Sequence, residues 1–300
     1  MDFGQVLTAM ITPFDENGKI DFKATRELVN YLIANGTDGL VVAGTTGESP
    51  TLTEEEKLDL FSYVSKVVQG RVPVIAGTGS NDTGSSINLT KQAEKTGVDG
   101  IMLVTPYYNK PSQEGLYQHF NTIAASTTLP VMLYNIPGRS AVNMSADTIV
   151  RLSQVDNIVS VKEASGDLDQ MTEIISRTSD DFTLYSGDDS LTLPSLAVGG
   201  NGVVSVASHI IGNEMQDMVT SYKKGEVTHA AAVHRSLLPT MKALFAAPSP
   251  TPVKAGLNML GVNIREDVRL PMVPLNKEEK STLQSVLQPL MTRDDEVAGY

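Results

Sequence analysis

The sequence predicts a (β/α)8 TIM barrel followed by a small helical domain at the C-terminus. Eight short runs rich in Val, Ile and Leu recur at intervals of roughly 20 to 34 residues, each followed by a polar loop and a helical stretch. Near-continuous apolar runs are typical of parallel strands buried on both faces. The runs are Val6–Ile11, Gly39–Ala43, Val72–Ala76, Gly100–Val104, Pro130–Tyr134, Ile158–Val161, Phe182–Tyr185 and Gly202–Val206.

The stretches between these runs have helical features. Phe22–Ala34 carries apolar residues at helical spacing and ends just before Gly36. Thr53–Val68 opens with the capping-box pair Thr53 and Glu56. Further helices are predicted at Gln113–Ser126, Ala146–Ser153 and Leu168–Arg177. Strands that alternate with helices also fit an open doubly wound sheet, but the chain lacks the complete GxGxxG fingerprint of that fold.

After residue 224 the strand alternation stops. Helical stretches are predicted at Thr228–Leu244, Val253–Leu260 and Lys277–Leu290, with a proline cluster between the first two. We therefore expect residues 1–224 to form the catalytic barrel and residues 225–300 a helical domain. The polar end, Thr292–Tyr300, is expected to fray.

The composition excludes several classes of function. Lys and Arg number 23 and Asp and Glu 35, so the formal net charge of −12 disfavours binding to nucleic acid or to an anionic membrane. No apolar run is long enough for a transmembrane helix, and the N-terminus has no basic region typical of a signal peptide. The absence of cysteine fits a cytoplasmic protein. The four histidines show no zinc-binding spacing, so we expect no metal site.

Lys162 is the most informative candidate for chemistry. Active sites of such barrels lie at the C-terminal ends of the strands, and Lys162 ends the apolar run IVSVKEA. Burial would lower the pKa of its amine and favour a Schiff base with a carbonyl substrate. The structural alternative is a lysine that emerges at the strand end and pairs with a surface carboxylate.

Other strand ends carry groups that suit the same chemistry. The loop Gly44–Glu48 offers backbone amides and the hydroxyls of Thr45 and Thr46 for a carboxylate, Tyr134 offers a phenol, and Arg139 a guanidinium. Taken singly, these features also fit a tight turn, a packed aromatic residue and a surface arginine. Asp188 and Asp189 fit a loop or a helix N-cap. Together with Lys162, the set indicates a lysine-dependent aldolase or lyase that acts on an oxo acid.

These residues lie in long motifs that resemble the dihydrodipicolinate synthase/N-acetylneuraminate lyase family of class I aldolases. The motifs are ITPF, GTTGES, VIAGTGSN, TPYYNKPSQEGLYQHF, LYNIPGR, VKEASGD, YSGDD and RLPMVPL, and they cover almost the whole chain. The resemblance implies a (β/α)8 barrel with a C-terminal helical domain. It also implies the branch that condenses pyruvate with L-aspartate-4-semialdehyde in lysine and diaminopimelate biosynthesis.

The resemblance implies a role for each site residue. Lys162 forms the Schiff base with pyruvate, Tyr134 relays protons, and Thr46 links Tyr134 to Tyr108, which reaches into the site of a partner subunit. The remaining substrate-binding roles fall on the carboxylate cradle of Thr45 and Thr46, on Arg139 for the semialdehyde carboxylate, and on the pocket positions Gly187 and Val204.

The family chemistry implies no organic cofactor and no catalytic metal. Lys162 forms an imine, proton loss gives an enamine, the enamine attacks the aldehyde, and the substrate amine displaces Lys162 and closes the ring. The family is usually tetrameric, so a homotetramer is expected rather than a dimer.

Effector residues depart from the pattern of lysine-inhibited members, which carry histidines at positions 54 and 57 and glutamate at position 85. The candidate effector site here consists of Ser49, Glu54, Lys57, Asn81, Ser85 and Tyr107. Without a carboxylate at position 85, we expect L-lysine to inhibit weakly or not at all.

Two other functions remain open from the sequence. The first is an N-acetylneuraminate lyase or 2-keto-3-deoxy sugar-acid aldolase of the same family, which Arg139 and the Tyr107–Tyr108 pair disfavour. The second is a non-catalytic oxo-acid sensor, which the presence of both Lys162 and Tyr134 disfavours.

Overall fold

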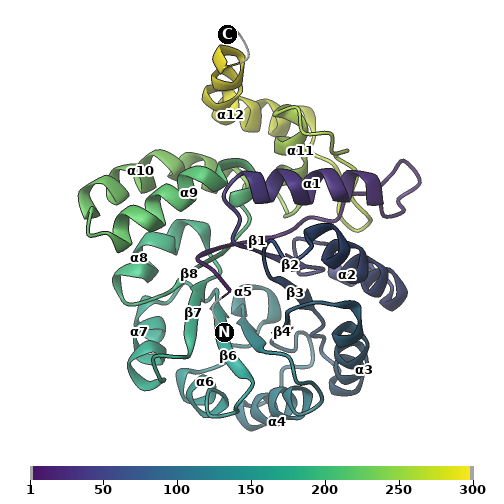
Figure 1. Cartoon of the computed structure of the whole chain (residues 1–300), viewed down its shortest axis with the longest axis vertical. Coiled ribbons are helices and arrows are strands. Elements are labelled where there is room, and N and C mark those ends of the chain that lie inside the picture. Colours follow the sequence, from purple (N-terminus) through teal and green to yellow (C-terminus); the bar gives the residue numbers. More distant parts are fainter. Residues whose placement is uncertain (1–2, 298–300) are drawn as a thin grey trace.

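The core of the molecule is a closed barrel of eight parallel strands in the order β1 to β8 (Figure 1). The computed structural model describes residues 3–297. The strands are β1 (Val6–Ala9), β2 (Gly39–Val42), β3 (Val74–Gly77), β4 (Gly100–Val104), β5 (Val131–Asn135), β6 (Ile158–Glu163), β7 (Thr183–Ser186) and β8 (Gly202–Ser205). Each strand pairs with the next, and β8 closes against β1. The predicted fold class is confirmed.

Helices form a ring around this barrel (Figure 1). They are α1 (Phe22–Ala34), α2 (Glu54–Val68), α3 (Thr83–Ala93), α4 (Gln113–Ala124), α6 (Ala146–Leu152), α7 (Leu168–Arg177), α8 (Thr192–Ala197) and α9 (Ser208–Lys223). The short α5 (Pro137–Ser140) lies near the centre of the view, and 3-10 turns are present at η1 (Ser49–Thr51), η2 (Glu94–Thr96) and η3 (Asp189–Leu191). The capping box predicted at the start of α2 is present, because the Thr53 and Glu56 side chains each accept a hydrogen bond from the other residue's backbone N–H.

The C-terminal segment consists of α10 (Val227–Ala243), α11 (Thr251–Met259) and α12 (Lys277–Val297). In Figure 1, α10 lies beside α9, while α11 and α12 extend beyond α1 at the top of the view. The expected end of the last helix at Leu290 is wrong, since α12 continues to Val297 through residues that include no glycine or proline. Residues 298–300 of the tail expected to fray lie outside the described residues. The division at residue 224 stays a prediction.

Among the described residues, no helix combines the length and apolarity needed to cross a membrane.

Two strands carry the residues on which the site depends. In the register of β5 and β6, Tyr134 pairs with Lys162 and Asn135 with Glu163. A bulge precedes these pairs, because Val131 pairs with Ile158 while Met132 pairs with Ser160. The sequence predicted that β6 ends at Val161, but the strand continues for two more residues to Glu163. Lys162 therefore lies within β6 rather than after it.

Two layers of apolar side chains stabilise the barrel. The larger layer lies between strands and helices, and the smaller one fills the interior of the barrel. Phe3 is fully buried in the interior layer, and the Tyr185 hydroxyl donates to the Gly4 carbonyl at 3.0 Å. This packing closes the N-terminal end of the barrel, so the opposite end is left for the site.

Candidate active site

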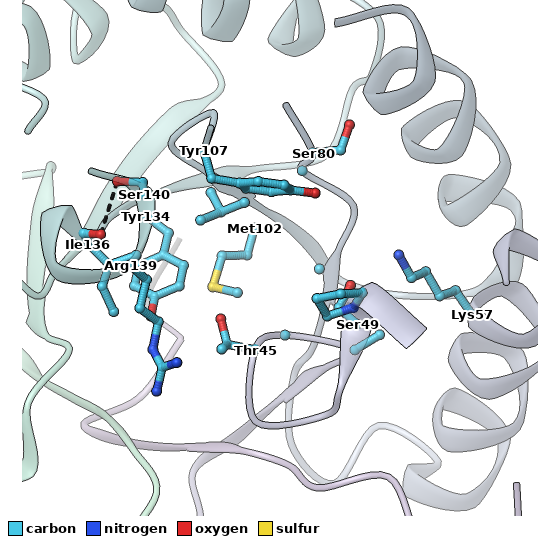
Figure 2. Close-up of a pocket in the computed structure, with 16 residues that line it drawn as sticks. Thr45, Ser49, Lys57, Ser80, Met102, Tyr107, Tyr134, Ile136, Arg139 and Ser140 are labelled. Atoms are coloured by element: carbon cyan, nitrogen blue, oxygen red, sulfur yellow. Dashed lines mark hydrogen bonds between the residues drawn. The ribbon is translucent and has the colours of Figure 1, made fainter. Parts of the chain in front are cut away.

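A cavity of about 260 Å³ opens at the C-terminal end of the barrel (Figure 2). Its wall includes Tyr134 and Arg139 at one end and Ser49 and Lys57 at the other, with Met102 at its base (Figure 2). Its wall is contributed by the loops after β2, β3, β4 and β5, as the barrel architecture predicts.

Lys162 lies against the ring of Tyr134, with its Nζ 4.2 Å from the ring centroid. The side chain is only 6% exposed, and burial lowers the pKa of Lys162 to about 8, although the nearby carboxylates of Asp188 and Asp189 oppose this shift. Among residues 3–291, whose side chains the structure describes, no ion pair includes Lys162. A neutral amine is therefore accessible near neutral pH, as a Schiff-base nucleophile requires.

Gly187 lies directly beside this lysine. A Cβ atom at position 187 would be 3.2 Å from Cε of Lys162 and 2.5 Å from Cβ of Ala164. A side chain there would clash with Ala164 and crowd the lysine. Val204 belongs to the buried interior layer of the barrel. The structure therefore places Gly187 next to the lysine side chain and Val204 in the interior of the barrel.

Tyr134 is buried, and burial raises the pKa of its phenol to about 12, while the Arg139 charge and a hydrogen bond with the Thr45 side chain lower it. Thr45, rather than the expected Thr46, is the threonine whose side chain lowers the pKa of Tyr134, and it also lines the cavity, while the relay role of Thr46 stays a prediction. Consecutive residues of the turn point in different directions, and the Thr46 side chain is buried outside the cavity wall.

The turn that carries these threonines is rigidly held. The Glu48 N–H donates to the Thr45 carbonyl at 3.0 Å, and the Thr12 hydroxyl donates to the Gly47 carbonyl at 2.7 Å. Ala43 and Glu48 have φ values of 51° and 56°, in the left-handed region that non-glycine residues rarely adopt. Such strain persists only where the surroundings impose it, and it is common in ligand-binding turns.

Tyr107 and Tyr108 point in different directions. Tyr107 lines the cavity, whereas Tyr108 is 89% exposed and has a φ of 72°. The Asn81 amide donates to the Tyr107 carbonyl at 3.1 Å, and the Asn109 amide donates to the Asn81 carbonyl at 2.8 Å. Asn81 therefore anchors the loop that presents Tyr108, and a single chain does not bring Tyr108 into its own cavity.

The predicted effector residues separate into two groups. Ser49, Lys57 and Tyr107 line the cavity. Glu54, Asn81 and Ser85 do not. The Glu54 carboxylate accepts from the Asn88 amide at 2.7 Å, and the exposed Ser85 donates its backbone N–H to Asp82. Burial lowers the pKa of Lys57, and the Glu54 charge opposes that shift.

The two aspartates after β7 have different surroundings. Asp189 is buried, and its carboxylate accepts from the Ala207 N–H at 2.9 Å and the Val206 N–H at 3.2 Å. It thus holds the turn between β8 and α9. The alternative of an N-cap is not seen, since neither Asp188 before η3 nor Ala207 before α9 makes a side-chain cap hydrogen bond. Asp188 is half-buried, and burial raises its pKa, whereas the Lys162 charge lowers it.

Sequence reasoning missed Glu163, the residue after the lysine. Its buried carboxylate accepts from the Asn135 amide at 3.0 Å, the Gln170 amide at 3.1 Å and the Ser165 N–H at 2.8 Å. Because Asn135 follows Tyr134 and Glu163 follows Lys162, this contact fixes the two reactive side chains relative to each other. The signal in the sequence was two polar residues at consecutive strand ends.

Within the part of the chain that the structure describes, no group of three or more His, Asp or Glu side chains is arranged to hold a metal ion.

The comparisons with known proteins agree with this geometry. A 4-hydroxy-tetrahydrodipicolinate synthase from Oceanobacillus iheyensis is 61% identical over 287 residues, which is 96% of this chain and 97% of that protein. The crystal structure of a dihydrodipicolinate synthase from Bacillus anthracis is 62% identical, with a TM-score of 0.94 over 96% of this chain and 98% of the other. A lysine-bound structure of the enzyme from Cyanidioschyzon merolae is 46% identical, with a TM-score of 0.93 over 95% of this chain and 97% of the other.

The sequence profile of the dihydrodipicolinate synthetase family matches residues 2–290. The chain belongs to the dihydrodipicolinate synthetase family.

Proposed function

We propose that this chain condenses pyruvate with L-aspartate-4-semialdehyde to 4-hydroxy-tetrahydrodipicolinate, in lysine and diaminopimelate biosynthesis. It is a lyase of the class I aldolase type, and the name shared by its relatives supports this activity. The observation that carries the proposal is the buried amine of Lys162 against the Tyr134 ring, at the catalytic end of the barrel. No feature of the site favours a sugar-acid lyase or a sensor.

The first step needs a neutral amine and a route for protons. With a pKa of about 8, Lys162 attacks the ketone carbon of pyruvate, and the resulting carbinolamine loses water to give an imine. Tyr134 and Thr45 are hydrogen-bonded to each other, so they form a relay for the protons that leave nitrogen and join oxygen. The amides of the turn around Thr46 bind the pyruvate carboxylate.

The later steps use the same groups. Loss of a methyl proton converts the imine to an enamine, whose carbon attacks the aldehyde of the semialdehyde. Arg139, in the cavity wall beside Tyr134 (Figure 2), binds the carboxylate of that second substrate. The substrate amine then attacks the imine carbon, and ring closure releases Lys162. This reaction involves no organic cofactor and no catalytic metal.

We also propose that the enzyme is a homo-oligomer, a tetramer rather than a dimer, and that it acts in the cytoplasm. Tyr108 supports the first statement, because an aromatic side chain that is 89% exposed and held in left-handed backbone suits contact with another subunit. The absence of cysteine supports the second. Sedimentation of the purified protein measures the subunit number.

Reduction of the imine tests the proposed chemistry. The protein is incubated with pyruvate and borohydride, and intact mass and peptide mapping follow. We expect a stable adduct on Lys162, and none in Lys162→Arg. A folded protein without an adduct contradicts the proposal. Condensation of the semialdehyde, measured beside cleavage of N-acetylneuraminate, then distinguishes the synthase from the sugar-acid lyase.

A further inference from the structure

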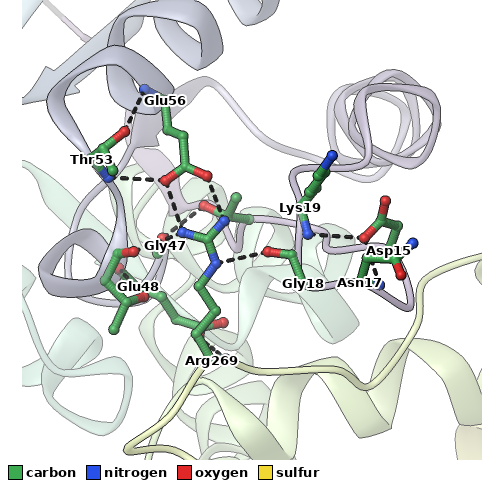
Figure 3. A network of polar contacts seen from close by, with 11 residues as sticks. Asp15, Asn17, Gly18, Lys19, Gly47, Glu48, Thr53, Glu56 and Arg269 are labelled. Atoms are coloured by element: carbon green, nitrogen blue, oxygen red, sulfur yellow. Dashed lines mark hydrogen bonds and ion pairs between the residues drawn. The ribbon is translucent and has the colours of Figure 1, made fainter.

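A buried network of charged side chains lies behind the carboxylate-binding turn (Figure 3). It joins Glu48, the last residue of that turn, to Lys254 on α11 and to Arg269 in the loop before α12. Lys254 and Arg269 follow Glu48 in the chain by 206 and 221 residues. The C-terminal segment therefore contacts a part of the site directly.

Both carboxylate oxygens of Glu48 are bound. Lys254 Nζ donates to Oε1 at 2.6 Å, and the Arg269 backbone N–H donates to Oε2 at 2.9 Å. Glu48 is 4% exposed, so water does not replace these partners. Its backbone N–H closes the turn onto the Thr45 carbonyl, as described above. A shift of the Glu48 side chain would therefore displace the turn that carries Thr45 and Thr46.

Lys254 has no exposed surface, and its ammonium is fully surrounded. Besides Glu48, it donates to the Asp267 carbonyl at 2.7 Å and lies 4.3 Å from the centroid of the Phe14 ring. Burial lowers the pKa of Lys254, while Glu48 raises it. A lysine held by a carboxylate, a carbonyl and a ring has one defined position and cannot adapt as a surface lysine does.

Arg269 extends the network to neighbouring loops. Its guanidinium binds both oxygens of Glu56, donates to the Gly18 carbonyl at 2.9 Å and to the Thr51 carbonyl at 2.7 Å (Figure 3). These contacts hold the loop after β1 and the start of α2 on either side of the turn. The Arg269 backbone, which binds Glu48, is fixed as a result.

A purely structural role explains this arrangement poorly. A buried ion pair contributes little net stability compared with a well-packed apolar pair of the same volume, yet it fixes geometry closely. Here the fixed residue has a strained left-handed backbone and belongs to the turn that binds substrate. The fixed geometry of the ion pair therefore determines the position of the turn.

We propose that Glu48 is a positioning residue for pyruvate: Lys254 and Arg269 hold its carboxylate, and so set the turn that binds the pyruvate carboxylate. This inference rests on the proposed function, in which that turn is the carboxylate cradle. It assigns a role in substrate affinity to two residues of the C-terminal segment that do not touch the substrate.

The test removes both charges of the pair at once, so that no unpaired charge remains buried. In the full-length Glu48→Gln/Lys254→Met variant, we expect the KM for pyruvate to rise by about tenfold or more, with a much smaller change in kcat and in the KM for the semialdehyde. Pyruvate-dependent borohydride trapping of Lys162 should shift by the same factor. The matched control is Glu266→Gln/Lys280→Met, an ion pair of the same segment that does not contact the turn, and it should leave all values unchanged.

A second variant covers the case in which the double variant does not fold. Glu48→Asp keeps the charge but shortens the side chain by one methylene, so it cannot hold both partners unless the turn moves. Its KM for pyruvate should also rise. A folded double variant or Glu48→Asp protein with the wild-type KM for pyruvate overturns the inference. Absence of the Lys162 adduct in the wild-type protein would instead overturn the proposed function, so the two failures are distinct.

Discussion

Lys162 and Lys254 are both buried lysines, and the difference between their surroundings explains their different roles. Lys162 lies against the ring of one tyrosine, and it forms no ion pair with any of residues 3–291. Lys254 lies against Phe14 and also binds Glu48 at 2.6 Å. Burial lowers the pKa of both amines, but only Lys254 has a carboxylate in contact that favours its charged form. Burial alone therefore does not identify a nucleophilic lysine, because a carboxylate in contact with the amine keeps it charged.

The largest expected effect comes from replacing each of the two buried lysines in turn. Lys162→Met should lower kcat/KM by at least about 10³-fold, because the covalent route is lost, with little loss of stability. Lys254→Met should still form the pyruvate adduct, but it leaves the Glu48 carboxylate buried and unpaired, which costs about 3–5 kcal/mol of the free energy of unfolding. Steady-state kinetics and denaturant unfolding measure the two effects. Similar losses of activity in both variants would remove the distinction.

The pH dependence sharpens the comparison. Attack on pyruvate needs the neutral amine, and the pKa of Lys162 is lowered from 10.5 to about 8. The rate of imine trapping should therefore rise with pH up to about 8 and then level off, falling about tenfold for each pH unit below that value. Stopped-flow or quench trapping between pH 6 and 10 measures the rate constant. A profile that keeps rising up to pH 10 would mean that Lys162 is not desolvated in solution.

The surroundings of Lys162 give the next prediction. Thr45→Val removes a hydroxyl that acts on Tyr134, so kcat should fall by about 10²-fold, the lower end of the range typical for loss of positioned proton transfer. Thr46→Val should mainly raise the KM for pyruvate, since Thr46 lies outside the cavity wall and supports the turn. Each variant is the control for the other. The reverse pattern would restore Thr46 to the relay.

The smallest expected effect concerns a third lysine, Lys57, at the far end of the cavity (Figure 2). Its ammonium and the absence of a carboxylate at Ser85 disfavour a cationic effector there. L-Lysine should therefore change the rate little at millimolar concentration. Initial rates with increasing lysine measure this, and submillimolar inhibition would contradict it.

The sequence was sufficient for the fold and for the end of the barrel at which the candidate site lies, for physical reasons. Eight apolar runs specify a parallel barrel, and the barrel rule then places Lys162, Tyr134 and Arg139 at one end. The helices α3, α8 and α9 were not delimited for three different reasons: α3 has few apolar residues, α8 is only 6 residues long, and the apolar β8 run leads into α9.

Contacts between segments that are distant in the chain could not be predicted from the sequence. The choice of Thr45 over Thr46 depends on side-chain direction in a strained turn, which neighbouring identical residues do not reveal. The pairing of Glu48 with Lys254 depends on how α11 packs against the barrel, and no local pattern encodes a contact across 206 positions. The same holds for the buried Glu163–Asn135 contact.

The bulge in β6 has a consequence for how this enzyme tolerates change. In an unbroken ladder from the Val131–Ile158 pair, Val161 would stand opposite Tyr134; the extra residue, Val159, brings Lys162 there instead. Successive side chains of a strand point to opposite faces, so the register of β6 decides whether the side chain of Lys162 or that of Val161 stands beside Tyr134. A single inserted or deleted codon between this bulge and the lysine would leave the hydrophobic composition of the strand almost unchanged and still abolish catalysis. Between this bulge and Lys162, the number of residues therefore matters more than which apolar residues they are.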